Sequence, residues 1–153
     1  MTTNELLQNI MPCGCVCYTC TGCAHGAIAL HAKDLLYYLE GMEEFRANQP
    51  DYEAIATTMG ALRFWATQNC PGCRVDGPNQ CTYADCPVCD CAKAHAVDFC
   101  YLCTEYPCAN INKVAKWRTA NDYMLHHGPQ AYWEQEKQLP HYRDYKNQTA
   151  HNA

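Results

Sequence analysis

Two apolar stripes dominate the first half of the chain, and both have the three- and four-residue steps of an amphipathic helix. The first stripe consists of Ile28, Ala32, Leu35, Leu36, Leu39 and Met42. It stops before Pro50, because a proline disfavours helix in the residue before it. Asp51 is then a suitable N-cap residue for a second stripe, which consists of Tyr52, Ile55, Met59, Leu62 and Ala66. The pattern predicts two antiparallel helices joined by a short turn.

A third helical pattern follows Cys108 and runs towards Leu125. We expect it to end at Gly128 and Pro129, because glycine suits the left-handed residue after a helix and proline cannot continue it. A short helix over residues 130–139 is expected next. The last residues, 141–153, are polar and lack a period, so we expect a frayed tail behind a single domain that spans residues 1–140.

Large apolar residues are sparse between residues 70 and 108, where turn formers such as Gly77 and Pro78 are frequent. One or two helical turns are expected within residues 92–98. Such a segment cannot bury enough apolar surface to offset its ordering entropy, and bound metal ions can make up the deficit. The sequence therefore predicts a mainly α fold, with a helical hairpin and a C-terminal helix beside an irregular, metal-stabilised, cysteine-rich lobe with zinc-knuckle-type loops.

Cysteine changes this picture most, with 14 in 153 residues. In a short secreted chain this would indicate a disulfide scaffold. The N-terminus carries Glu5 without a basic cluster, however, and Gln8 and Asn9 interrupt its apolar residues, so it does not resemble a signal peptide. We therefore expect a reducing, cytoplasmic location, where clustered cysteines are more often metal ligands than disulfide partners.

The charge balance argues against nucleic acid as a partner. The formal net charge is −5, and only Lys113, Lys116 and Arg118 among the 11 basic residues come close together. Phosphate contacts supply most nucleic-acid affinity, so a binder needs a basic face. No apolar run approaches the roughly 20 residues that a membrane span needs. The sequence also contains no phosphate-binding glycine loop, nucleophile elbow or H-E-x-x-H motif.

The order of the cysteine motifs resembles that of a known family. It runs from PCG-x2-C-x2-C through two helices to CPGC-R, two spaced cysteines, C-x2-C-x4-C and G-x4-W. This set resembles the cysteine-rich family of domain of unknown function 3795 (DUF3795) from bacteria and archaea, over about residues 10–137. The resemblance implies a metal-binding protein and brings no established activity. The matching cysteines are Cys13, Cys17, Cys20, Cys70, Cys73, Cys81, Cys86, Cys100, Cys103 and Cys108.

These ten cysteines are the candidate metal ligands, and their partition stays open. Short loops close at the least entropic cost, so Cys70, Cys73, Cys81 and Cys86 can make one complete tetrahedral site. Three more, Cys100, Cys103 and Cys108, then need a fourth ligand, which Cys13, Cys17 or Cys20 can supply. A rival partition pairs Cys70 and Cys73 with Cys100 and Cys103, as in a zinc ribbon. Outside the family pattern lie Cys15, Cys23, Cys89 and Cys91.

Two or more Zn²⁺ ions are the expected cofactors, and an iron–sulfur cluster is the alternative. Cys17, Cys20 and Cys23 are spaced C-x2-C-x2-C, as in half of a bacterial ferredoxin motif. The fourth ferredoxin cysteine should follow soon afterwards, whereas the next cysteine here is Cys70. This mismatch favours zinc.

Three functions follow, in descending order. The first is a non-catalytic binding or regulatory module for an unknown protein partner, with structural zinc. The second is an iron–sulfur electron-transfer or redox protein. The third is a zinc- or thiol-dependent enzyme, which ranks lowest because no histidine or carboxylate is placed by a motif as a general base.

Overall fold

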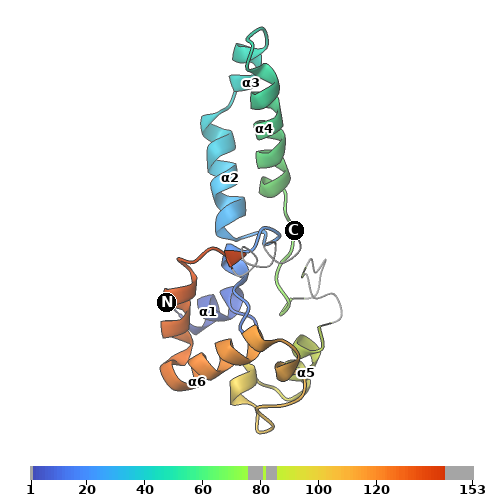
Figure 1. Cartoon of the computed structure of the whole chain (residues 1–153), viewed down its shortest axis with the longest axis vertical. Coiled ribbons are helices and arrows are strands. Elements are labelled where there is room, and N and C mark those ends of the chain that lie inside the picture. Colours follow the sequence, from blue (N-terminus) through green and yellow to red (C-terminus); the bar gives the residue numbers. More distant parts are fainter. Residues whose placement is uncertain (1, 76–80, 82–85, 144–153) are drawn as a thin grey trace, which may run out of the picture.

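The structure is a computed structural model, and it describes residues 2–75, 81 and 86–143. The described residues form six α-helices and three short 3-10 helices, and their only β-type pairings are two isolated bridges. The mainly α class expected from the sequence is confirmed. A long helical hairpin projects from a body that contains the remaining helices and most of the irregular chain (Figure 1).

The hairpin consists of α2 (Ala27–Tyr38), α3 (Met42–Arg46) and α4 (Tyr52–Ala66). Its small core is built from Ala32, Met59 and Leu62. Leu36 packs against this core, but Leu35, which the sequence analysis placed on the same stripe, is 48% exposed. The two predicted antiparallel helices are therefore present, with an apolar stripe narrower than expected.

The turn of the hairpin differs from the prediction in two respects. The first helix ends at Tyr38, because Gly41 adopts a left-handed conformation with φ 78° before α3 begins. Asp51 does stand at the N-cap position of α4, but its side chain makes no cap hydrogen bond. Its carboxylate instead forms an ion pair with Arg46, so this residue fixes the turn rather than the helix end.

The N-terminal helix α1 (Thr3–Asn9) was not expected from the sequence. Its signal is a capping box, in which the Thr2 side chain accepts from the Glu5 backbone and the Glu5 side chain accepts from the Thr2 backbone. Leu6 and the following Ile10 are buried in the core of the body. This helix therefore anchors the start of the first cysteine cluster.

The C-terminal helix α6 (Ala115–Glu136) runs across the lower part of the body in Figure 1. It is interrupted at Gly128, whose φ of 81° is not helical, so the helix break predicted at Gly128 and Pro129 is confirmed. Ile111, expected on the same helix, lies in the preceding 3-10 turn η3 (Ile111–Lys113). Tyr132 and Trp133, after the break, return to the buried core.

In the described part of the cysteine-rich segment, residues 70–75, 81 and 86–108, the α-helix is α5 (Val88–Ala94), which begins earlier than the expected turns within residues 92–98. Two 3-10 turns, η1 (Cys17–Thr19) and η2 (Cys100–Leu102), each begin at the first cysteine of a C-x2-C pair. In both, the backbone N–H of the second cysteine donates to the carbonyl of the first, at 2.9 Å and 3.1 Å. The two knuckles therefore share one local backbone geometry.

The first residues of the expected tail contact the body. His141 and Tyr142 reach the first cysteine loop, and Arg143 pairs with Glu136. Residues 144–153 lie outside the described residues. No helix in the described part of the chain is long and apolar enough to cross a membrane.

Candidate functional site

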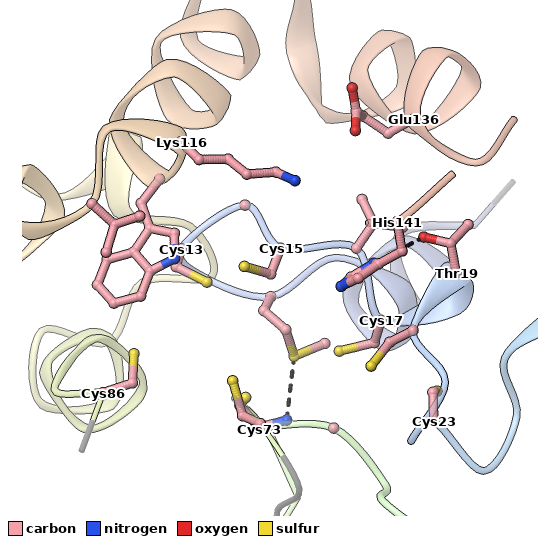
Figure 2. A pocket seen from close by; sticks show the side chains of 18 of the residues that line it. Cys13, Cys15, Cys17, Thr19, Cys23, Cys73, Cys86, Lys116, Glu136 and His141 are labelled. Carbon is pink, nitrogen blue, oxygen red and sulfur yellow. Dashed lines mark hydrogen bonds between the residues drawn. The ribbon is translucent and has the colours of Figure 1, made fainter. Parts of the chain in front are cut away.

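Nine of the cysteines line one cavity of about 380 Å³ (Figure 2). They come from the first cysteine loop, from the C-x2-C pair after α4 and from the segment before α5. We call this space the thiol cavity. Its cysteines are Cys13, Cys15, Cys17, Cys20, Cys23, Cys70, Cys73, Cys81 and Cys86.

The segment that carries Cys13 and Cys15 forms one wall of the cavity and packs closely against α6. Gly14, between them, has a φ of 89°, and a Cβ at this position would lie 2.4 Å from the Cβ of Ala120. The hydroxyl of Tyr132 donates to the Gly14 carbonyl at 2.8 Å. Only glycine allows both the left-handed backbone and the close approach to Ala120. Packing against α6 therefore explains the glycine of the Pro12-Cys13-Gly14 motif.

Asn121 of α6 completes this attachment and is fully buried. Its side-chain amide donates to the carbonyls of Pro12 at 3.4 Å and Trp117 at 3.0 Å. Its carbonyl oxygen accepts from the backbone N–H of Tyr101 at 3.0 Å. One side chain therefore joins the start of the first cysteine loop, α6 and the Cys100 knuckle.

Backbone hydrogen bonds join the second wall to the first. The Cys70 N–H donates to the Gly22 carbonyl at 3.2 Å, and the Ala24 N–H donates to the Cys70 carbonyl at 3.0 Å. This is the parallel bridge between Cys23 and Cys70. Segments almost 50 residues apart are thus held together by backbone pairing, independently of any bound group.

Cys73 is held on two sides. Its N–H donates to the Met11 sulfur at 3.3 Å, and its carbonyl accepts from the Cys89 thiol at 2.6 Å. Cys89, which is not among the residues that line the cavity, is therefore a structural partner of the knuckle. Arg74 continues the attachment by donating to the carbonyls of Ile10 at 3.1 Å and Asp98 at 2.6 Å.

Four of the nine cavity thiols form two hydrogen-bonded pairs, and the first pair is Cys13 and Cys15. A hydrogen bond with Cys15 and burial raise the pKa of Cys13. The same hydrogen bond lowers the pKa of Cys15, and the charge of Lys116 and the Trp117 side chain lower it further. Figure 2 shows Lys116 extending over the cavity towards Cys15.

The second pair is Cys73 and Cys81. A hydrogen bond with Cys81, followed by burial, raises the pKa of Cys73 far above its ordinary range. Burial likewise raises the pKa of Cys17 and of Cys86. Thiols that are costly to ionise in isolation are thus concentrated in one place. A cation that binds thiolates would offset this cost.

Residues near the C-terminus form the remaining wall. The guanidinium of Arg143 donates to both carboxylate oxygens of the buried Glu136, at 2.9 Å and 2.8 Å. His141 Nδ1 lies 3.1 Å from Thr19 Oγ1. Burial, together with the charges of Lys116 and Arg143, lowers the pKa of His141. The sequence analysis missed these residues, because nothing in their polar, aperiodic stretch indicates where it folds back.

The last three candidate ligands lie outside the thiol cavity but close to it, since Cys100 and Cys108 pack against the same buried cluster as Cys73 and Cys86. Cys100, Cys103 and Cys108 are not among the residues that line the thiol cavity. Burial and the nearby thiols of Cys108, Cys91 and Cys103, in that order, raise the pKa of Cys100 to about 12. Cys91, outside the family pattern, is thus the neighbour that α5 brings to this group.

The structure places Cys70, Cys73, Cys81 and Cys86 around one cavity together with the N-terminal cysteines. The local site made from these four residues and the zinc ribbon made from Cys70, Cys73, Cys100 and Cys103 both stay predictions. Within residues 2–75, 81 and 86–143, no three ligand side chains are grouped so that they could hold one metal ion.

The match to a known family covers two thirds of the chain. Residues 9–113 match the profile of the family described as "Protein of unknown function (DUF3795)". The chain belongs to this family. The DUF3795 match includes every cysteine that lines the thiol cavity and ends before α6 begins, so Gly128 and Trp133 lie beyond it. No curated protein and no solved structure matches the chain.

Proposed function

We propose that this DUF3795 protein is a metal–thiolate module whose thiol cavity holds a polynuclear centre of the iron–sulfur type. The observation that carries the proposal is nine cysteines around one space of about 380 Å³. Nine soft sulfur donors suit zinc, copper(I) or iron–sulfur clusters and suit magnesium or calcium poorly. The donor set therefore points to a thiophilic metal.

The size of the space favours a cluster over one zinc ion. A structural zinc site draws four donors to within about 2.3 Å of a single point. The volume of the cavity is instead more than ten times the roughly 30 Å³ that one water molecule occupies in the liquid. A cluster binds one thiolate at each of several iron atoms, so its ligands can stand around a larger space and come from separate segments.

Seven cysteines would hold the centre, because they line the cavity and belong to the family pattern: Cys13, Cys17, Cys20, Cys70, Cys73, Cys81 and Cys86. When bound, an iron–sulfur cluster supplies one-electron chemistry. The protein would contribute the thiolates, the positive charge of Lys116 and a largely buried environment. We infer a non-catalytic role, because the carboxylate and the imidazole that line the cavity are both engaged in hydrogen bonds. Glu136 binds Arg143, and His141 binds Thr19.

Zinc is the second candidate, and the thiol pairing favours it. Cys13 with Cys15 and Cys73 with Cys81 are two hydrogen-bonded pairs from opposite walls. Four thiols are the number that one structural zinc site needs. In this case the protein would be a zinc-stabilised binding or regulatory module for a protein partner, without redox chemistry.

Metal and acid-labile sulfide analysis of protein purified without oxygen separates these candidates. We expect iron and sulfide in near-equal amounts, together with a brown colour. Two zinc ions per chain in colourless protein would transfer the assignment to zinc. Less than one metal ion per chain in reduced protein would contradict both candidates.

A further inference from the structure

The segment formed by residues 140–143 crosses the first cysteine loop and is attached to it by side chains. The hydroxyl of Tyr142 lies 2.7 Å from Thr21 Oγ1 and accepts from the Thr21 N–H at 3.3 Å. It also lies 3.8 Å from the sulfur of Cys20. The preceding residue, His141, contacts the hydroxyl of Thr19.

The other end of this segment is anchored to α6. Glu136 is only 7% exposed, and both of its carboxylate oxygens accept from Arg143. One guanidinium nitrogen, Nη2, donates to both oxygens, which makes a charge-assisted hydrogen bond shared between them. Because a buried carboxylate that lost its partner would be costly, the anchor is stronger than an exposed ion pair. The segment is therefore fixed to α6 while it holds the Cys17–Cys20 knuckle.

This segment also has hollow space on both sides. Thr19, His141, Tyr142 and Arg143 line the thiol cavity on one side. The same four residues line a second hollow of about 730 Å³ on the other side, next to Ala27 and Ile28. The segment is thus a thin partition between the thiols and an outer depression. If it moved away, the two spaces would join.

From this placement we infer that residues 140–143 form a clasp, in which Tyr142 is the positioning residue that holds Cys20 and closes one side of the thiol cavity. The clasp would control how readily the knuckle thiols are reached and how firmly a bound centre is retained. The inference rests on the proposed function for its biological meaning. The geometry of the clasp can nevertheless be tested whether or not a metal is bound.

The test compares alkylation of individual cysteines in the full-length, reduced protein as isolated. Iodoacetamide is added, and mass spectrometry follows modification at each cysteine. Tyr142→Phe removes the hydroxyl that contacts Thr21 and Cys20 and keeps the ring. Tyr37→Phe makes the same change on the hairpin, where Tyr37 is 74% exposed, and serves as the matched control.

We expect Tyr142→Phe to speed alkylation of Cys17 and Cys20 by roughly three- to tenfold, the range that corresponds to one lost hydrogen bond. Tyr37→Phe should leave these rates unchanged. Thr21→Val removes the same bond from its other side, so the double variant with Tyr142→Phe should react little faster than Tyr142→Phe alone. Such non-additivity distinguishes a shared contact from two independent losses of stability.

Two results would overturn the clasp. One is an unchanged rate at Cys17 and Cys20 in Tyr142→Phe. The other is equal acceleration at Cys103 and Cys108, which lie outside the thiol cavity, because that would indicate general loss of fold. Metal content, measured on the same samples, reports separately on the proposed function. A metal-free protein with faster Cys20 alkylation in Tyr142→Phe would retain the clasp and reject the metal centre.

Discussion

Single residues decide how closely the first cysteine loop approaches α6, and Gly14 shows this best. Its position demands a left-handed backbone, and any side chain there would overlap Ala120. The sequence around Cys13 could not reveal this packing partner, because Ala120 is more than 100 residues away. A neighbour so distant in sequence is set by tertiary packing rather than by local propensity.

Gly14→Ala should therefore lower the free energy of unfolding by at least about 2 kcal/mol, since overpacking and a left-handed alanine add their costs. Gly60→Ala is the matched control. Gly60 lies in α4 with no atom within 4 Å of an added Cβ, so alanine should stabilise the helix by about 0.5–1 kcal/mol. Urea unfolding of both variants measures the difference. Equal effects at the two positions would contradict the packing of Gly14 against α6.

His141 gives the clasp a dependence on pH. Burial lowers its pKa in the folded protein, so the unfolded chain takes up a proton more readily. Stability from this group is then complete above the ordinary histidine pKa of about 6.5 and is lost as the pH falls below that value. Urea midpoints between pH 8 and pH 5 should fall less steeply for His141→Gln than for the unchanged protein. Parallel curves would show that His141 is not buried in this way.

At the scale of elements, the sequence was most informative where helical periodicity was strong. The two hairpin helices and the break at Gly128 were predicted because apolar spacing and helix-ending residues act locally. α1 was missed although Thr2 and Glu5 carry its capping box, because a helix of 7 residues has too short a periodic pattern to recognise. In the cysteine-rich segment, contacts such as Arg74 with Ile10 place the turns, and no periodicity encodes them.

The hairpin and the cysteine-rich lobe should respond differently to loss of metal. α2 and α4 pack against each other through Ala32, Met59 and Leu62 and contribute no cavity-lining residue. Treatment with a strong chelator under reducing conditions should therefore leave much of the helical circular dichroism. Amide hydrogen exchange should accelerate around Cys73 and Cys86 but not around Met59. Simultaneous loss of protection in both regions would mean that they form one cooperative unit.

At the scale of the whole molecule, the cysteine spacing identified candidate ligands but not which of them would lie around one space. Nine thiols meet in one cavity because backbone pairing of Cys70 with Gly22 and Ala24 brings the two clusters together. Cys100, Cys103 and Cys108 follow the same kind of motif and yet lie in a different place, near Cys91. The spacing of cysteines in the sequence indicates which of them can bind one metal ion from the same turn. The tertiary fold determines which of these turns lie next to each other.

The most direct test of the thiol cavity as the metal-binding site is metal stoichiometry in two matched cysteine variants. Cys73→Ser changes a thiol that lines the cavity, and Cys91→Ser changes one that lies outside it. Both proteins are purified without oxygen, and metal and sulfide are measured per folded chain. We expect Cys73→Ser to lose the centre wholly or in large part and Cys91→Ser to retain it. Full metal content in Cys73→Ser, or equal loss in both variants, would contradict the thiol cavity as the site.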